Sequence, residues 1–461
     1  MNYTDLLQPD RGQPARAIHI VPPAEWAAWL AAQPPRARAT VAAHGLTDKP
    51  GNKAILPGDG PDDWSALLVC DEPATSPWRF ASMGAFLPAG TYRLADGEPG
   101  AGALGWLLGQ YRFDRYRKAD EAGSRILLTP DAARLEETIR LAEATALVRD
   151  LVNTPASDCG PADLEAAAEA LAKRHGATLT VTRGDALATG FPMIHTVGMA
   201  ASKARHPRLI ELEWGDPAHP RAAIVGKGVT FDTGGLDIKP AAGMKLMKKD
   251  MGGAAHALAL AGLVLAARLP VRLHLLIPAV ENSIAGNAFR PGDVLRTRAG
   301  LMVENTNTDA EGRLILGDAL TRAAEGKPEL ILDYATLTGA ARVALGPDLP
   351  PLFCNEDALA DALLAAGTAL GDPLWRMPLW DGYDDQLKSD IADLQNAPEG
   401  GMAGAVTAAL FLRRFVPKDV AWAHMDVFAW RPAAKAGRPK GGDAYGLRAA
   451  FQVLKERYGR R

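Results

Sequence analysis

Two short segments of the sequence concentrate charged residues among glycines and apolar residues, the setting in which a buried polar site shows itself. The first runs from Ile224 to Ala255 and reads IVGKGVTFDTGGLDIKPAAGMKLMKKDMGGAA. Its Lys227 and Asp232 follow an apolar run that predicts a buried strand, and open α/β sheets gather ligands beyond the ends of such strands. The glycines of this segment let backbone approach a bound group closely.

The second segment, NTDAEGRLILGDAL, spans residues 307–320 and leads into a helix with apolar periodicity. Asp309, Glu311 and Arg313 recur at every second position, and in an extended chain this spacing places them on one side. The segment also fits a structural role, because Thr308 and Glu311 match a capping box and Asp309 in a first helical turn suits the macrodipole. The segment alone leaves both interpretations open.

Taken together, the two segments hold one lysine and four carboxylates: Lys227, Asp232, Asp250, Asp309 and Glu311. Four carboxylates share a pocket only when cations neutralise them, and two divalent ions would do so. Oxygen-rich ligation favours Mn²⁺, Mg²⁺ or Zn²⁺ over a soft thiolate site. Lys227 can be a ligand only as a neutral amine, although its ordinary pKa is about 10.4, and a neighbouring dication can displace that proton.

The elements that must position these residues alternate between apolar strands and helices. We expect helices over 162–175, from about 254, and over 314–324, and strands over 177–183, 207–214, 222–231, 272–280 and 329–336. This alternation predicts a mixed, largely parallel sheet flanked by helices. The first 125 or so residues alternate short apolar runs, such as 66–70, with Pro and Gly, as a small α/β domain does.

A helix that starts at Thr129-Pro130-Asp131 and stops at Asn153-Thr154-Pro155 marks the domain junction. We therefore predict an α/β protein of two domains, a smaller N-terminal α/β domain over 1–128 and a larger catalytic domain over 156–461, joined by a connecting helix over 129–155. A length of 461 residues suits such a division.

Composition excludes several classes of protein. The 51 basic and 54 acidic residues leave a net charge of -3, which does not favour nucleic-acid binding. Three widely spaced cysteines, Cys70, Cys159 and Cys354, build neither a disulfide framework nor a thiolate zinc site. His-Glu-x-x-His and Gly-x-Ser-x-Gly motifs do not occur, nor does a signal peptide or an apolar run of 18 residues. We expect a soluble cytoplasmic protein with no membrane partner.

Several motifs, in order and spacing, closely resemble the leucyl aminopeptidase (cytosol aminopeptidase) family of two-metal exopeptidases. They are VGKGVTFDTGGLDIKP, MKKDMGGAA, ENSIAGNAFRPGDV, NTDAEGRL and DYATLTGA, with NTDAEGRL the most specific. The resemblance runs from about Asn153 to the C-terminal region. The segment HMDVFAWRPAAKAGRPKGGDAYGLRAAF departs from the usual family ending, and this departure concerns subsite preference rather than the reaction.

The resemblance implies roles for seven residues. The family's metal ligands fall on Lys227, Asp232, Asp250, Asp309 and Glu311. Asp232 and Glu311 would bridge the ions, Lys227 and Asp250 would complete one site, and Asp309 the other, including its backbone carbonyl. The two catalytic residues that are not ligands fall on Lys239 and Arg313. Two divalent ions, Mn²⁺ or Zn²⁺, and a bicarbonate at Arg313 acting as general base are the implied cofactors.

The implied reaction is attack of a metal-bridging hydroxide on the first peptide bond of a peptide with a free N-terminus. The implied pocket for the side chain of the N-terminal residue includes Met247, Thr336 and Gly339, with the Leu337 carbonyl near the amine, and a leucine-like preference. Family members assemble as hexamers, so we expect a homohexamer. Two alternatives stay open, namely a two-metal phosphohydrolase and an additional DNA-binding role.

Overall fold

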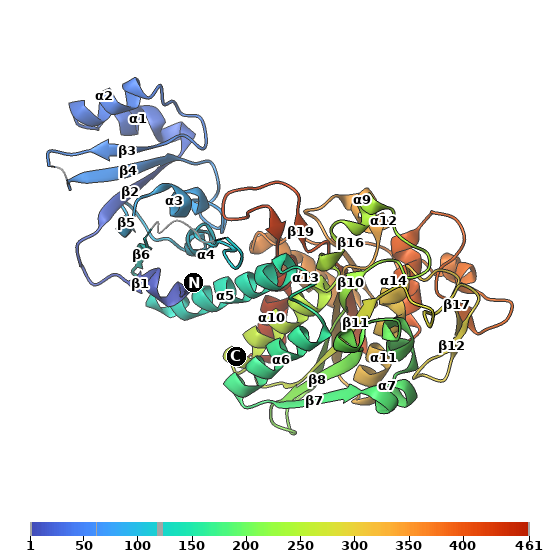
Figure 1. Ribbon diagram of the computed structural model, residues 1–461. Helices are drawn as coiled ribbons and strands as arrows, with labels where there is room; N and C mark the ends of the chain where they lie inside the picture. Colours follow the sequence, from blue (N-terminus) through green and yellow to red (C-terminus); the bar gives the residue numbers. More distant parts are fainter. Residues whose placement is uncertain (1, 61, 118–122, 460–461) are drawn as a thin grey trace. The chain divides into compact units, whose positions relative to one another are not determined.

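A computed structural model describes residues 2–60, 62–117 and 123–459 of the chain. The chain divides into two compact units, Met1–Ala146 with Ala433–Pro439, and Leu147–Pro432 with Lys440–Arg461. Each unit has its own sheet with helices packed on it (Figure 1). The predicted fold class, an α/β protein of two domains, is confirmed.

The first unit is built on a six-stranded sheet with the order β1-β6-β5-β2-β4-β3. Its strands are β1 Leu7–Pro9, β2 Arg16–Val21, β3 Lys53–Pro57, β4 Trp64–Val69, β5 Gly90–Leu94 and β6 Arg125–Thr129. Its helices are α1 Trp26–Ala31, α2 Pro35–Ala43, α3 Ala81–Phe86 and α4 Gly102–Leu108, and helix α5 Ala132–Asn153 contains the division between the units. Buried Phe80, Tyr92 and Trp106 form the centre of its core.

The second unit is built on a nine-stranded sheet with the order β16-β15-β18-β14-β9-β11-β8-β7, to which β10 adds by pairing with β11. The strands are β7 Thr178–Arg183, β8 Arg208–Trp214, β9 Arg221–Gly226, β10 Gly228–Asp232, β11 Arg272–Asn282, β14 Leu330–Ala335, β15 Pro351–Cys354, β16 Trp375–Arg376 and β18 Ala421–Asp426. Strands β18, β14, β9, β11 and β10 pair in parallel, while β8, β7 and β15 join antiparallel. The sheet is therefore mixed, with a parallel centre.

Helices cover both faces of this sheet. The helices of this unit are α6 Pro161–His175, α7 Gly184–Gly190, α8 Pro192–Gly198, α9 Ala241–Met244, α10 Gly252–Ala266, α11 Glu311–Glu325, α12 Gly339–Leu345, α13 Asp357–Ala369, α14 Gly404–Arg413 and α15 Leu447–Tyr458. On β9, Ala223 and Val225 join the core that contains α11, whereas Gly226 backs onto α10. Alternate residues of one strand thus serve opposite faces.

Two small sheets complete this unit, formed by β12 Val294–Arg296, β13 Met302–Glu304 and β17 Leu394–Gln395, and by β19 Trp430–Arg431 and β20 Gly441–Gly442. Within the described ranges, none of the helices combines the length and the apolar character that crossing a membrane requires.

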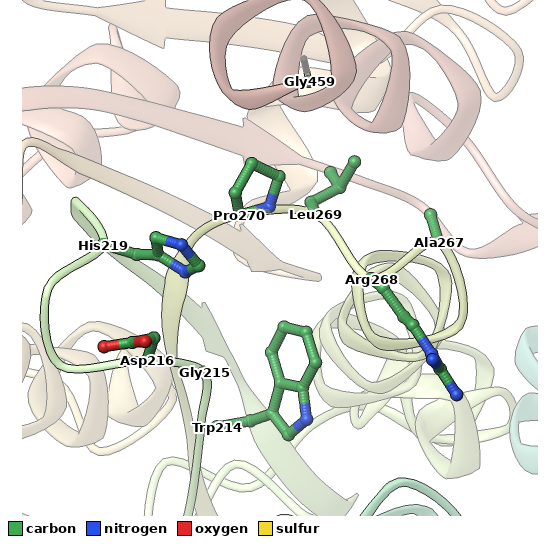
Figure 2. A pocket seen from close by; sticks show the side chains of 9 residues that line it. All are labelled: Trp214, Gly215, Asp216, His219, Ala267, Arg268, Leu269, Pro270 and Gly459. Carbon is green, nitrogen blue, oxygen red and sulfur yellow. The ribbon is translucent and has the colours of Figure 1, made fainter.

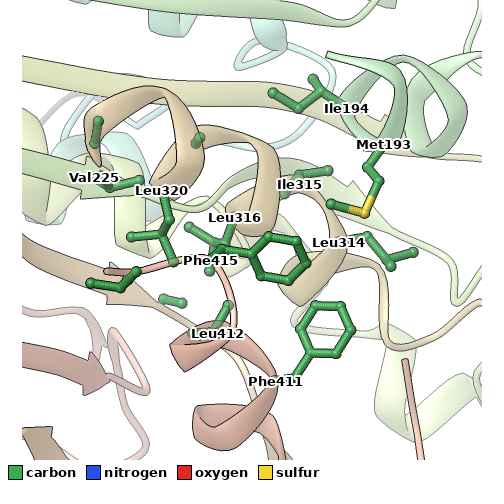
Figure 3. Close-up of a cluster of buried hydrophobic side chains, with 14 of the residues drawn as sticks. Met193, Ile194, Val225, Leu314, Ile315, Leu316, Leu320, Phe411, Leu412 and Phe415 are labelled. Atoms are coloured by element: carbon green, nitrogen blue, oxygen red, sulfur yellow. The ribbon is translucent and has the colours of Figure 1, made fainter. Parts of the chain in front are cut away.

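Helix α11 is fixed by a large apolar core. Its Leu314, Ile315, Leu316 and Leu320 are buried against Phe411 and Leu412 of α14, Phe415 just after α14, and Met193 and Ile194 of α8 (Figure 3). Burying a large aliphatic or aromatic side chain stabilises a fold by about 1.5–3 kcal/mol. The first turn of α11 is therefore a rigid platform for the charged residues that it carries.

Candidate metal centre

The charged residues gather at the carboxyl ends of the parallel strands. Lys227 directly follows β9, Asp232 is the last residue of β10, and Asn282 is the last residue of β11. Thr336 directly follows β14, and Asp426 ends β18. Because these strands are parallel neighbours, their ends form one edge, which is where open α/β sheets bind ligands.

All five predicted metal ligands meet at this edge. The Nζ atom of Lys227 lies 2.8 Å from Asp250 Oδ2 and 2.9 Å from Glu311 Oε1. One carboxylate oxygen from each of Asp232, Asp309 and Glu311 lies within 4.8 Å of the others. Two separate chain segments, one with Asp232 and one with Asp309 and Glu311, therefore bring their oxygens close enough to share cations.

Two residues are predicted to act in catalysis without binding metal. Lys239 lies beside the cluster, and Arg313 lies in the same helical turn as Glu311. Lys239 Nζ is 2.8 Å from Asp232 Oδ2 and also pairs with Asp309. Arg313 is buried in the first turn of α11, two residues after Glu311, and its Nη1 donates to the Asn396 carbonyl at 2.6 Å. Its Nε is buried and donates to no group that the structure describes.

Mutual repulsion and burial shift the pKa values of the cluster. Burial, followed by the charge of Asp232, raises the pKa of Glu311 to about 8 and that of Asp309 to about 6. Burial lowers the pKa of Lys227, but Asp250, Glu311 and Asp232 outweigh it and the net shift is upward. The carboxylates are thus crowded anions that favour any added positive charge.

Several oxygens of the cluster also lack hydrogen-bond donors. Asp250 Oδ2 and Glu311 Oε1 are within ion-pair distance of Lys227, yet neither accepts a well-oriented hydrogen bond from the described residues. The buried Glu311 Oε2 accepts none either, and neither does Asp309 Oδ1, although Asp309 Oδ1 forms an ion pair with Lys239. Buried polar atoms seldom lack a hydrogen-bond partner. Divalent cations would satisfy these oxygens, because hard cations prefer carboxylate oxygen ligands.

Neighbouring residues hold the cluster in place. Asn282 Nδ2 donates to Asp232 Oδ1 at 2.9 Å, and Thr336 Oγ1 donates to Asp250 Oδ1 at 2.8 Å. Lys227 Nζ donates to the Thr336 carbonyl at 3.0 Å. Sequence reasoning missed Asn282 as a support, although its position at the end of β11 carries the same signal as Asp232 at the end of β10.

Three local predictions about the ligand segments are wrong. The extended arrangement of Asp309, Glu311 and Arg313 does not form, because Glu311 is already the first residue of α11. The capping box does not form either, since the N-cap of α11 is Ala310 without a side-chain hydrogen bond. The single strand predicted over 222–231 is two strands, which break at Lys227.

The residues predicted to line the substrate pocket lie next to the cluster. Met247 begins the 3-10 turn Met247–Lys249, directly before Asp250. Leu337 follows Thr336, and Gly339 begins α12. Burial lowers the pKa of Lys249 to about 8, although the charge of the neighbouring Asp250 acts to raise it.

A separate pocket lies away from this edge (Figure 2). Trp214, Asp216, His219 and Pro270 are among its lining residues, and they precede the amino ends of β9 and β11. None of the predicted ligands lines it. We therefore assign the chemistry to the carboxylate cluster and not to this pocket.

Comparisons with known proteins agree with the geometry. The family model for the catalytic domain of the cytosol aminopeptidase family matches residues 146–451, and the model for the N-terminal domain of M17 aminopeptidases matches residues 17–129. A probable cytosol aminopeptidase of Syntrophotalea carbinolica is 42% identical over 370 residues, which are 76% of this chain and 74% of that protein.

Solved structures of similar proteins share the whole fold. The crystal structure of cytosol aminopeptidase from Coxiella burnetii is 45% identical, with a TM-score of 0.93 over 98% of this chain and 99% of that chain. The bottromycin maturation enzyme BotP in complex with Mn is 33% identical, with a TM-score of 0.85 over 96% of this chain and 100% of that chain. The family predicted from the motifs is confirmed: this chain belongs to the cytosol aminopeptidase family and is a metal-dependent exopeptidase that removes residues from the N-terminus of peptides.

Proposed function

We propose that this aminopeptidase binds two divalent cations, Mn²⁺ or Zn²⁺, in the carboxylate cluster. Asp232 and Glu311 would hold both ions, Lys227 and Asp250 would complete one site, and Asp309 would complete the other with its side chain and its backbone carbonyl. The observation that carries this assignment is the approach of three carboxylates to within 4.8 Å, with buried oxygens that lack donors. The manganese in the similar BotP structure supports Mn²⁺.

Two residues then serve the reaction without binding metal. When bound, the two cations lower the pKa of a nucleophilic water and polarise the peptide carbonyl. Lys239, whose Nζ lies against Asp232 and Asp309, stabilises the negative charge that develops on the carbonyl oxygen. Arg313 stays protonated, because burial lowers its pKa only to about 10, and so it cannot be the base. Its buried Nε, which has no partner within the described ranges, suits a bound bicarbonate that serves as general base.

The substrate is a peptide with a free N-terminus, whose amine is held at the metal centre. Met247, Thr336 and Gly339 contribute to the pocket for the side chain of the N-terminal residue, and the Leu337 carbonyl lies near the amine. A leucine-like side chain suits the adaptable, apolar Met247. We call this region the S1 pocket.

The decisive experiment compares hydrolysis of leucinamide and N-acetyl-leucinamide, with and without a chelator. We expect cleavage of leucinamide alone, because acetylation removes the amine that the metal centre recognises. We also expect activity to disappear with the chelator and to return with added Mn²⁺. Equal cleavage of both compounds, or activity that is indifferent to the chelator, would falsify the proposal.

We further propose a cytoplasmic homohexamer, with a domain over 1–128 and a catalytic domain over 156–461 joined by a helix over 129–155. The cytosolic names of the relatives support the location. Trp380, Ile391 and Met402 expose large apolar side chains, which assembly would cover. Sedimentation velocity distinguishes a hexamer from a monomer.

A further inference from the structure

Two cationic side chains converge on one aromatic ring in the catalytic unit. The Lys249 Nζ lies 5.2 Å from the centroid of the Phe428 ring, and the guanidinium carbon of Arg342 lies 4.7 Å from it. Lys249 ends the turn that precedes Asp250, Arg342 belongs to α12, and Phe428 follows β18. Three segments distant in sequence thus build one cationic cluster, which we define as Lys249, Arg342 and Phe428.

Neither cation has a carboxylate partner among the residues that the structure describes. Lys249 is only 2% exposed, yet it forms no ion pair or hydrogen bond there, and Arg342 Nη1 is buried without an acceptor. The Asp426 carboxylate already accepts other hydrogen bonds. Its Oδ1 accepts from the Leu337 backbone N–H at 2.9 Å, and its Oδ2 accepts from Thr338 Oγ1 at 2.6 Å. Lys249 is buried and Arg342 is half-buried, and the nearby Asp250 and Asp426 form no ion pair with either, so the cluster suits an added anionic group.

Arg342 and Lys249 are adjacent to residues of the S1 pocket. A Cβ atom placed on Gly339 would lie 3.7 Å from Arg342 Nη2, so the guanidinium lies against that glycine. Lys249 lies between Met247 and Asp250 in the sequence, in the short turn that joins the pocket to the metal centre.

Phe428 lies in the same region as Thr336, because its sequence neighbour Ala429 packs there. A Cβ atom on Gly252 would lie 2.4 Å from Ala429 Cβ and 3.0 Å from Thr336 Cγ2. Ala429 and Thr336 therefore both pack on Gly252, at the start of α10. The cationic cluster and the S1 pocket are parts of one neighbourhood.

We propose that the S1 pocket binds an acidic side chain, so that the enzyme releases N-terminal glutamate and aspartate as well as leucine-like residues. The aliphatic stem packs against Met247 and Phe428, and the carboxylate accepts hydrogen bonds from Arg342 and Lys249. Charge-assisted hydrogen bonds of this kind are about twice as strong as neutral ones. This inference rests on the aminopeptidase function proposed above and adds a substrate class to it.

The wild-type enzyme tests the inference with three p-nitroanilides, those of glutamate, glutamine and leucine. Glutamine has the shape of glutamate without its charge, so the two compounds differ only in what the cations recognise. We expect kcat/KM for the glutamate compound to exceed that for the glutamine compound at least tenfold. Cleavage of the leucine compound with no preference for glutamate over glutamine overturns the inference and leaves the proposed function intact. Cleavage of none of the three, with Mn²⁺ present, overturns the proposed function itself.

Single variants then assign the preference to the cluster. Arg342→Leu and Lys249→Met should each lower the glutamate-to-glutamine ratio of kcat/KM at least tenfold. The matched controls Arg296→Leu and Lys418→Met remove the same charges from exposed positions, and they should keep the wild-type ratio. A ratio that is unchanged in both cluster variants overturns the assignment.

Charge reversal provides a gain-of-function test that does not depend on a loss of activity. Arg342→Glu should raise kcat/KM for the lysine p-nitroanilide relative to the glutamate compound by at least tenfold, and failure to do so counts against the inference. The cations could instead bind the C-terminal carboxylate of a dipeptide. If they do, the amidated form of the dipeptide Leu-Gly would bind more weakly than Leu-Gly itself, and the preference for glutamate over glutamine would be absent. That result also overturns the inference.

Discussion

Asp237 and Thr308 hold each other through a reciprocal pair of backbone-to-side-chain hydrogen bonds. The Asp237 N–H donates to Thr308 Oγ1 at 2.8 Å, and the Thr308 N–H donates to Asp237 Oδ2 at 2.7 Å. These two hydrogen bonds join the loop that carries Lys239 to the loop that carries Asp309. Because Lys239 and Asp309 meet in an ion pair, their mutual position depends on this tie.

Removal of the Asp237 carboxylate should therefore weaken metal binding. We expect Asp237→Ala to lower Mn²⁺ affinity by about 10–100-fold, the usual effect of losing an outer support of a metal ligand. Asp237→Asn should lose less, because its amide oxygen can still accept from the Thr308 N–H. Isothermal titration calorimetry measures both, with the exposed Asp419→Ala as control. Equal affinity in Asp237→Ala and wild type would show that the tie does not support the site.

Gly312 leaves room for Lys227, one of the proposed metal ligands. A Cβ atom at this position would lie 2.5 Å from Lys227 Cε and 2.7 Å from its Nζ, closer than real contacts allow. We expect Gly312→Ala to keep the fold, because the end of a lysine side chain can move, but to lose at least 100-fold in kcat/KM with leucinamide. Gly286→Ala is the matched control, since nothing lies within 4 Å of its added methyl group. Near wild-type activity in Gly312→Ala would mean that Lys227 is not needed where it lies.

Much of the fold could be predicted because the apolar strands carry their signal locally. The strand predicted over 272–280 is observed as β11 Arg272–Asn282, and the helix over 162–175 is observed as α6 Pro161–His175. The break at Lys227 could not be read from periodicity, because it depends on tertiary contacts. There the Lys227 N–H donates to the Tyr334 carbonyl, and the Lys227 carbonyl accepts from the Ala254 N–H.

Some features of the candidate site could be predicted from the sequence, and others could not. The ligand positions follow from motifs that combine glycines with carboxylates, and the structure brings all five residues together. A two-residue alternation from Asp309 to Arg313 is too short to separate a strand from the first turn of a helix, so its conformation was predicted wrongly. The cationic cluster could not be predicted, because Lys249, Arg342 and Phe428 meet only in the folded chain.

Two substitutions test the roles proposed for Asp232 as a metal ligand and Lys239 as a catalytic residue. We expect Asp232→Ala to lose bound metal and nearly all turnover, because a bridging carboxylate holds both ions. We expect Lys239→Ala to keep its metal and to lose turnover at least 100-fold, because it removes only the stabilisation of negative charge in the transition state. Metal content by mass spectrometry, measured beside kcat, distinguishes the two. Loss of metal from Lys239→Ala would reassign that lysine as a ligand.

His424 and Asp333 form a buried pair that should make stability depend on pH. The His424 Nδ1 lies 2.5 Å from Asp333 Oδ1, and Trp422 Nε1 donates to Asp333 Oδ2 at 2.6 Å. Burial lowers the pKa of His424, but the charge of Asp333 outweighs it, and the net pKa is above the ordinary value of 6.5. The folded state thus holds this proton more tightly than the unfolded state does.

The sign of the effect follows from linkage. The stabilisation from protonated His424 is complete below pH 6.5, the ordinary value, and is lost as the pH rises through the higher pKa of the folded state. We expect the difference in unfolding free energy between wild type and His424→Phe to shrink between these two limits, measured by urea titration at several pH values. The difference between wild type and His206→Phe, at an exposed position, should stay constant over the same range. A His424 difference that grows with pH would show that the pair is neutral in the folded state, because a neutral buried histidine favours folding only above its ordinary pKa.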